Sequence, residues 1–140
     1  MATHKTEIRV KFGDTDMAGV VYVVQYINYF MYSFEDLFRS IGVPIEDMIK
    51  TEIRGFPPTK VNSIFKAPAY CGDLLEVHTT VVKSFKKGVT LKFNLYKKGH
   101  DKLLTTGTIT FISINEKRKP ISLPQHVLDR LREYEEKISF

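Results

Sequence analysis

A chain of 140 residues, with 43% hydrophobic and 26% charged side chains, is long enough to bury a core, and we expect one domain over residues 1–140. The one cysteine, Cys71, excludes an internal disulfide, and the four histidines lack the spacing of metal ligands, so we expect no metal and no cofactor. No apolar run is long enough for stable membrane insertion, so we expect a cytoplasmic protein, and its net charge of +5 favours an anionic partner.

The first third of the chain predicts one strand and one long helix. Residues 7–12 alternate polar and apolar side chains, which is typical of a half-buried strand. From residue 24 to residue 41, apolar and aromatic side chains recur at every third or fourth position, which predicts a helix that is buried over more than half of its circumference. Gly42, as a left-handed cap, and Pro44 end this helix, and a short amphipathic turn follows over 45–49.

The rest of the chain consists mainly of strand-like segments that are joined by tight turns. Alternating and β-branched side chains predict four strands, over residues 61–65, 75–81, 89–96 and 103–114. A final amphipathic helix is predicted over 125–137. The sequence therefore predicts an α+β fold, in which a curved antiparallel sheet of about five strands wraps around the long helix. Exposed sheet edges in such a fold favour oligomerisation.

The segment between the first strand and the long helix carries most of the chemical information. It reads Phe12-Gly13-Asp14-Thr15-Asp16-Met17-Ala18-Gly19-Val20-Val21-Tyr22. Two acids, two residues apart, precede a helix start, where free backbone N–H groups stabilise developing negative charge. A carboxylate beside such an oxyanion site suggests an acyl transferase or a hydrolase. Taken alone, the two acids would also fit a helix cap or an Asx turn.

This motif, with Tyr26 soon after it, closely resembles the hot-dog-fold acyl-CoA thioesterases of the 4-hydroxybenzoyl-CoA thioesterase group, which includes the small bacterial thioesterases associated with the Tol–Pal system. The resemblance covers nearly the whole chain. It implies a hot-dog fold and a homodimer or homotetramer that hydrolyses a short-chain, medium-chain or aromatic acyl-CoA, with coenzyme A as part of the substrate. It also implies that Asp16 is the catalytic carboxylate, as general base or nucleophile, and that the backbone N–H of Val23 polarises the thioester carbonyl.

Other positions of the motif are assigned to substrate binding or to structure. Besides Val23, we expect Gly19, Tyr22 and Tyr26 to line the substrate site. Gly19 serves a tight turn, and its missing side chain also lets a thioester approach the backbone. For Asp14 we expect a structural role.

Seven lysines lie between residues 83 and 102, on a predicted hairpin, with one acid among them. In the family that the chain resembles, basic residues in this region contact the phosphates of coenzyme A, and a lysine is a suitable point charge for a phosphate. We therefore assign Lys86 and Lys87, at the turn of the hairpin, to substrate binding, with Arg118 and Lys119 as second candidates. The remaining lysines are interpreted as a solvated face.

Two positions depart from the pattern of the family. Members close to the Tol–Pal group carry a histidine where this chain has Val23. Acid or base help from that side chain is therefore absent, whereas the backbone N–H remains. Many members also carry an acid where Met31 lies, and an apolar residue there would widen or dry the acyl pocket.

Three other functions compete with hydrolysis. A hot-dog dehydratase needs a histidine in its site, and no histidine lies between His4 and His78. A non-catalytic module that binds acyl-CoA or acyl carrier protein would keep the fold without the chemistry, and the presence of Asp16 argues against it. A basic protein that binds nucleic acid would need exposed aromatic side chains among its lysines. Phe93 instead shares a strand face with apolar residues, so we expect no nucleic-acid partner.

Overall fold

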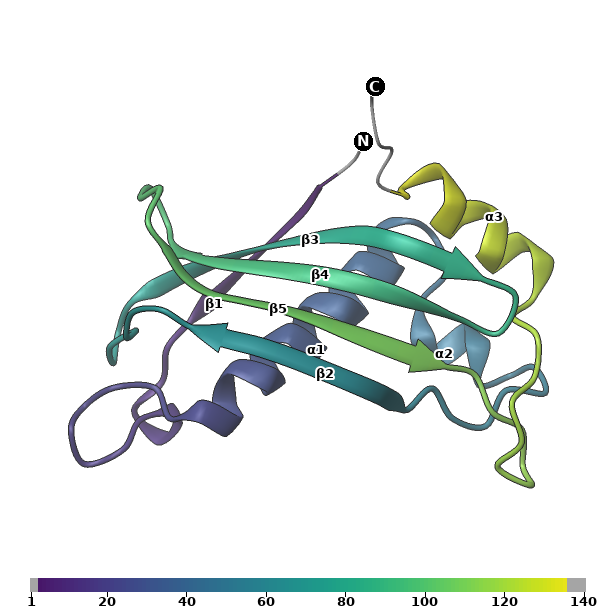
Figure 1. Ribbon diagram of the computed structural model, residues 1–140, viewed down its shortest axis with the longest axis horizontal. Coiled ribbons are helices and arrows are strands. Elements are labelled where there is room, and N and C mark those ends of the chain that lie inside the picture. Colours follow the sequence, from purple (N-terminus) through teal and green to yellow (C-terminus); the bar gives the residue numbers. More distant parts are fainter. Residues whose placement is uncertain (1–2, 136–140) are drawn as a thin grey trace.

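Five antiparallel strands and one long helix dominate residues 3–135, the part of the chain that the structure, a computed structural model, describes (Figure 1). In chain order the elements are β1 (His4–Arg9), the 3-10 turn η1 (Phe12–Asp14), α1 (Val23–Ser40), α2 (Ile45–Met48), β2 (Pro58–Phe65), β3 (Leu74–Phe85), β4 (Gly88–Lys97), β5 (Leu103–Ile112) and α3 (Gln125–Glu133). The strands form one sheet in the order β1-β3-β4-β5-β2, so β1 and β2 are its edges. The predicted α+β fold is confirmed.

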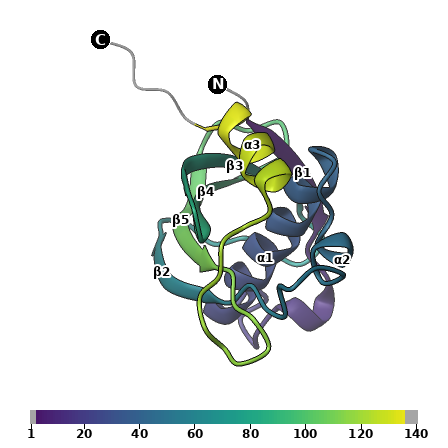
Figure 2. The ribbon, with the colours of Figure 1, turned by 90° about the vertical axis from the view of Figure 1, so that its right-hand side faces the viewer.

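The sheet curves around α1. Seen from the end of the molecule, the strands form an arc with α1 on its inner side, and α3 packs beside β3 (Figure 2). Because successive side chains of a strand point to opposite faces, alternate residues of β3 are buried against the core, among them Leu75, Val77 and Val81. The intervening residues form the outer, partly exposed face of the sheet.

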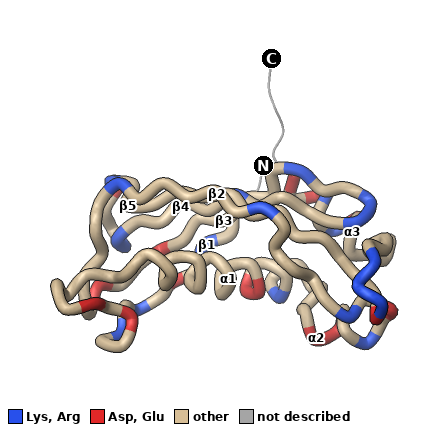
Figure 3. Tube along the Cα trace, turned by 60° about the horizontal axis from the view of Figure 1, so that its bottom comes forward, with Lys and Arg blue, Asp and Glu red and all other residues tan. Residues whose placement is uncertain are grey.

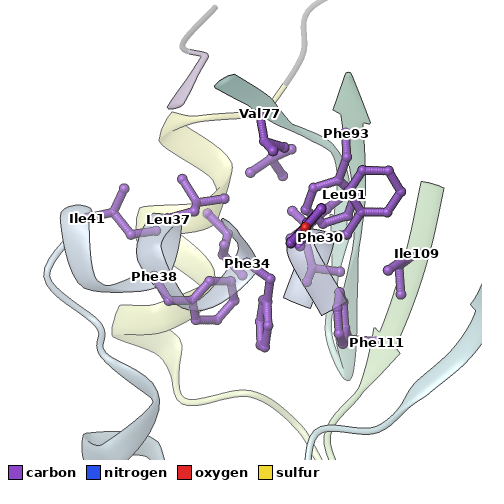
Figure 4. Close-up of a cluster of buried hydrophobic side chains, with 14 of the residues drawn as sticks. Phe30, Phe34, Leu37, Phe38, Ile41, Val77, Leu91, Phe93, Ile109 and Phe111 are labelled. Atoms are coloured by element: carbon purple, nitrogen blue, oxygen red, sulfur yellow. The ribbon is translucent and has the colours of Figure 1, made fainter. Parts of the chain in front are cut away.

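Aromatic side chains fill the space between α1 and the sheet (Figure 4). Phe30 stacks on Phe93 of β4 with 4.8 Å between ring centroids, and Phe34 stacks on Phe111 of β5 at 4.2 Å. A Cβ atom at Gly107 of β5 would lie 2.9 Å from the Phe30 ring, so this close approach requires glycine. Stacked pairs of this kind contribute about 0.5–1.5 kcal/mol beyond the burial of their area. They fix α1 relative to the sheet and so fix where each helix end lies.

The C-terminal end of α1 is closed by the predicted glycine. Gly42 has a φ of +84°, which is the left-handed conformation that favours glycine. The Gly42 N–H donates to the carbonyl of Arg39 at 3.1 Å, and the Val43 N–H donates to the carbonyl of Phe38 at 3.0 Å, which is the Schellman pattern. Among the residues that the structure describes, no helix has the length and apolar character needed to cross a membrane.

The boundaries of several elements differ from those predicted. The first strand covers His4–Arg9 rather than 7–12, because the chain turns into η1 after it. The third strand extends to Phe85, since it continues through an irregularity in its pairing with β4 between Val81 and Lys83. The last helix ends at Glu133, and the final two residues predicted for it lie outside the described residues.

Candidate active site

The loop between η1 and α1 is a closed hairpin. Thr15 and Val21 pair in an isolated antiparallel bridge, and the Asp16 N–H donates to the carbonyl of Val20 at 2.9 Å. The Gly19 N–H donates to the carbonyl of Asp16 at 3.0 Å. Gly19 has a φ of +79°, a backbone conformation that residues with a Cβ atom rarely adopt. The reversal of the chain after Asp16 therefore favours glycine at this position. The loop therefore returns Asp16 to a position beside the segment that leads into α1.

The carboxylate of Asp16 is exposed and fixed in direction by one hydrogen bond. Its Oδ1 accepts from the Ala18 N–H at 2.8 Å, which closes an Asx turn. Over residues 3–135, its Oδ2 has no hydrogen-bond partner. One carboxylate oxygen is thus anchored and the other is available to a water molecule or a substrate.

The carboxylate of Asp14 is engaged within the protein. Its Oδ2 accepts the hydroxyl of Tyr29 at 2.8 Å and the N–H of Lys11 at 3.0 Å. Burial, together with the neighbouring carboxylate, raises the pKa of Tyr29, so the phenol stays protonated and donates. Asp14 therefore has the structural role that was expected. The sequence alone does not reveal Tyr29 as its partner, because no local pattern links two residues that are 15 positions apart.

The first turn of α1 offers donors that nothing in the described part of the chain accepts. Tyr22 is the N-cap, and its side chain makes no capping hydrogen bond. The N–H groups of Val23 and Val24 have no acceptor among residues 3–135. Both side chains are more than half exposed, at 58% and 61%. Free N–H groups at the positive end of a helix can stabilise an oxyanion.

The structure brings most of the predicted site residues to one place. Asp16, Gly19, Tyr22 and Val23 all lie on the loop or on the first turn of α1. Tyr26 follows one turn later, is 4% exposed, and accepts the N–H of Ala69 on its hydroxyl oxygen at 3.1 Å. Its ring lies 5.5 Å from that of Phe65, at the end of the edge strand β2. A substrate contact of Tyr26 stays a prediction.

Lys86 and Lys87 lie at the opposite end of the sheet from this loop (Figure 1). They form the turn after the last residue of β3. The first residue of β3, Leu74, lies near the loop, because the turn before it forms backbone hydrogen bonds with Val10. The twelve residues of β3 span roughly 40 Å at about 3.3 Å per residue. Lys and Arg positions lie at both ends of the sheet, with one group around α3 at that far end, and the acids of the loop lie at the near end (Figure 3). One subunit therefore does not bring these lysines to Asp16.

The second pair of basic candidates sits on a tight turn at the same far end. Asn115 holds this turn, because its Oδ1 accepts the N–H groups of Lys117 at 2.9 Å and of Lys119 at 3.0 Å. Arg118 has a φ of +61°, the one positive φ of a non-glycine residue between residues 3 and 135. The turn follows the strand β5, which pairs with the first residues of β2. Arg118 and Lys119 thus lie next to the beginning of the free edge strand.

The fold and the chain resemble known thioesterases. Residues 10–131 match the model of the thioesterase-like superfamily. A 1,4-dihydroxy-2-naphthoyl-CoA hydrolase of Thermosynechococcus vestitus is 30% identical, over 71% of this chain and 68% of that protein. Acyl-CoA thioesterase YbgC of Haemophilus influenzae is 26% identical over 86% of this chain and 88% of that protein. The crystal structure of a DHNA-CoA thioesterase from Staphylococcus aureus has a TM-score of 0.85 and 29% identity, over 96% of this chain and 89% of that chain.

The superfamily match, over residues 10–131, covers the loop, the first turn of α1 and the strands β2 to β5. Within residues 3–135, no group of three or more His, Cys, Asp or Glu side chains is placed to hold a metal ion. The chain belongs to the thioesterase-like superfamily and is a thioester hydrolase with the hot-dog fold.

Proposed function

We propose that this protein hydrolyses an acyl-CoA to the free acid and coenzyme A, at the junction of the Asp16 loop with α1. The observation that carries the proposal is a carboxylate oxygen of Asp16 that has no partner among the described residues, on a loop that ends at the N–H of Val23, which has no acceptor among them either. Met17, Tyr22 and Val23 are exposed apolar side chains around this point, and such side chains suit a short-chain, medium-chain or aromatic acyl group. The naphthoyl-CoA and DHNA-CoA activities named for the relatives above favour the aromatic class.

In the general-base route, the thioester oxygen accepts the N–H of Val23, and the carboxylate of Asp16 removes a proton from a water molecule. The water oxygen then bonds to the carbonyl carbon, and negative charge collects on the carbonyl oxygen, where the helix start stabilises it. Collapse of this intermediate breaks the carbon–sulfur bond. The coenzyme A thiolate leaves and takes up the proton, and the acid remains.

In the nucleophilic route, an oxygen of the Asp16 carboxylate bonds directly to the carbonyl carbon, and the thiolate leaves to give a mixed anhydride. Water then hydrolyses the anhydride, which releases the acid and restores the carboxylate. Both routes use the same two groups, a carboxylate oxygen without a partner and a fixed N–H donor. Both therefore lose most of their rate when either group is removed.

The edge strand β2 lies beside the site, because its Phe65 contacts Tyr26, and a homo-oligomer formed along this edge would complete the site. Within residues 3–135, the strand β2 pairs only with β5, so its outer edge is free there. Val61, Ile64 and Phe65 on this strand are 43%, 61% and 43% exposed, which is unusual for apolar side chains along a free edge. We propose that two copies pair along β2 about a two-fold axis, as a homodimer or as half of a homotetramer.

This pairing explains how basic residues from the far end reach the substrate. Antiparallel pairing of two β2 strands places the beginning of one next to the end of the other. The far end of one subunit then lies beside the Asp16 loop of its partner. Lys86 and Lys87, with Arg118 and Lys119, would accordingly bind the phosphates of a coenzyme A whose thioester is held by the other subunit.

A hydrolysis panel tests the activity, with thiol release measured for short, medium, long and aromatic acyl-CoA esters. We expect turnover that is highest for an aromatic or a short-to-medium acyl group. Binding of acyl-CoA without turnover of any ester would instead support the non-catalytic module. Sedimentation at the assay concentration tests the assembly, and a fully active monomer would rule out the shared site.

A further inference from the structure

Two tyrosines, nearly one turn apart on α1, hold the segments on either side of the Asp16 loop. The hydroxyl of Tyr29 donates to Oδ2 of Asp14 at 2.8 Å, ahead of the loop. The hydroxyl oxygen of Tyr26 accepts the N–H of Ala69 at 3.1 Å, on the segment that flanks the loop on its other side. The two rings meet edge to face, with 6.2 Å between centroids, and are 4% and 1% exposed for Tyr26 and Tyr29.

Both of these segments bond directly to the loop. The backbone carbonyl of Asp14 accepts the N–H of Tyr22 at 3.4 Å, at the start of α1. The carbonyl of Ala69, whose N–H is held by Tyr26, accepts the N–H of Val21 at 2.9 Å. Tyr29 is thus connected to the loop through Asp14, and Tyr26 is connected to it through Ala69. The two connections end at Tyr22 and Val21, directly before Val23.

We propose that Tyr26 and Tyr29 are positioning residues that clamp the loop and set the direction of the Asp16 carboxylate relative to the Val23 N–H, an inference that rests on the proposed hydrolysis. A tyrosine suits this task because its ring is rigid and both rings are packed in the core. The distance between a reacting carboxylate and a carbonyl carbon matters greatly, since a displacement of about 1 Å can lower a rate about 10²-fold.

The clamp is distinct from a general contribution to folding. Replacing either tyrosine with phenylalanine removes one hydroxyl and leaves the ring to fill its place in the core. Tyr32 provides the matched control, because it lies on the same helix, is 53% exposed, and makes no hydrogen bond with its hydroxyl among residues 3–135. Tyr32→Phe removes the same hydroxyl from a position where it makes no hydrogen bond with the described residues.

The first measurement compares the steady-state kinetics of the three variants with an acyl-CoA that the wild-type protein hydrolyses. We expect Tyr29→Phe and Tyr26→Phe to lower kcat about 10- to 100-fold with KM nearly unchanged, and Tyr32→Phe to retain kcat. Asp14→Ala should reproduce the loss of Tyr29→Phe. Asp14→Asn keeps a side-chain oxygen that accepts both hydrogen bonds, so it should retain more of the rate than Asp14→Ala.

The second measurement places Tyr29→Phe in the Asp16→Asn background. If the clamp acts through Asp16, its removal should cost less than about twofold there, because residues that act as a unit are not additive. Backbone hydrogen exchange gives a readout without substrate. The Asp16 and Val21 amides, which donate within or beside the loop, should exchange faster in Tyr29→Phe than in Tyr32→Phe.

The outcomes separate the clamp from the hydrolysis on which it rests. A wild-type protein that hydrolyses no acyl-CoA, or Asp16→Asn with wild-type turnover, overturns both. If the wild type and Asp16→Asn behave as proposed but Tyr29→Phe matches Tyr32→Phe in kcat and in exchange, only the clamp is overturned. The clamp alone is also overturned if Tyr29→Phe lowers kcat by the same factor in the wild-type and in the Asp16→Asn background. Should Tyr29→Phe fail to fold, the two Asp14 variants test the clamp in its place. A kcat that is equal in Asp14→Ala and in Asp14→Asn would then overturn the clamp.

Discussion

The two ends of α1 differ in how far the chain completes them. At the C-terminal end, Gly42 and Val43 donate to carbonyls of the last turn, and Ile41 and Val43 are buried beside them. At the N-terminal end, Val23 and Val24 have free N–H groups and exposed side chains over the described chain. Water or a ligand can accept these N–H groups, and apolar side chains that are exposed beside them are typical of a binding surface. The C-terminal end of the helix is thus completed by its own chain, whereas the N-terminal end is where we propose that a ligand and a second subunit bind.

The largest loss of activity is expected when the carboxylate at the N-terminal end of the helix is removed. Asp16→Asn keeps the size of the side chain and an oxygen that can accept the Ala18 N–H, so the thermal midpoint should stay near that of the wild type. The loss of a general base should lower kcat by about 10²–10⁴-fold. Asp14→Asn is the matched control for the other acid of the loop. An equally large fall for Asp14→Asn, at unchanged melting temperature, would show that the two roles are reversed.

The oxyanion donor can be removed without breaking the helix. Proline is tolerated at the first position of a helix, where its missing N–H has no intrahelical partner, and Tyr22 has a ψ of 157°, which suits a residue before proline. Val23→Pro should therefore fold and lose about 10²–10³-fold in kcat. Val23→Ala keeps the N–H and measures the effect of the side chain alone. If the two variants hydrolyse acyl-CoA equally well, the oxyanion donor is not the Val23 N–H.

The elements that sequence predicts well here are those fixed by neighbours along the chain. The apolar period of α1 and the left-handed Gly42 depend on local geometry, and both are confirmed. The bond between Tyr29 and Asp14 could not be predicted, because it depends on how α1 lies against the loop. The distance of Lys86 from the loop could not be predicted for the same reason, since a lysine-rich hairpin does not reveal which end of the sheet it occupies.

The motif around Asp16 is an intermediate case. Its spacing predicted a turn, a carboxylate and a helix start, and the structure contains all three. The Asx turn of Asp16 shows that the structural interpretation of this acid also applies, on one of its two carboxylate oxygens. Sequence could not divide the two oxygens between structure and chemistry, because that division depends on the exact path of the backbone.

Two glycines with the same backbone conformation lie at the two ends of α1, one in the Asp16 loop and one at the C-terminal cap. Gly19 and Gly42 have φ values of +79° and +84°, and a Cβ at either one would meet no atom within 4 Å. Alanine at each position therefore costs only the left-handed strain, about 1–2 kcal/mol. Gly42→Ala should lower the free energy of unfolding and leave kcat intact, as measured by urea unfolding and by kinetics. Gly19→Ala should lower kcat as well, because the strained turn also carries Asp16. Equal losses of kcat in both variants would mean that the loop has no special part in turnover.

The smallest expected effect concerns the basic residues at the far end of the sheet. If Lys86 and Lys87 bind coenzyme A phosphates, they bind the ground state and the transition state alike. Lys86→Ala with Lys87→Ala should raise KM about 2- to 30-fold at unchanged kcat, from ~0.2–1 kcal/mol for each exposed charge pair. The effect should shrink at high salt. It should vanish for an acyl-N-acetylcysteamine, which has no phosphates, and an equal penalty on that substrate would assign the lysines to the fold or the pocket.

Mixing two defective proteins shows which subunit supplies these lysines. One protein carries Asp16→Asn, and the other carries Lys86→Ala with Lys87→Ala. In a hybrid dimer with a shared site, one of the two sites combines an intact Asp16 with intact lysines, whereas the other site lacks both. At substrate concentrations below the raised KM, exchange of subunits should therefore increase the rate above the sum of the separate proteins. If each site uses only the lysines of its own subunit, every site in the hybrid is defective and mixing adds nothing. The ~40 Å length of β3 makes this second outcome incompatible with a direct role for Lys86 and Lys87 in binding the substrate.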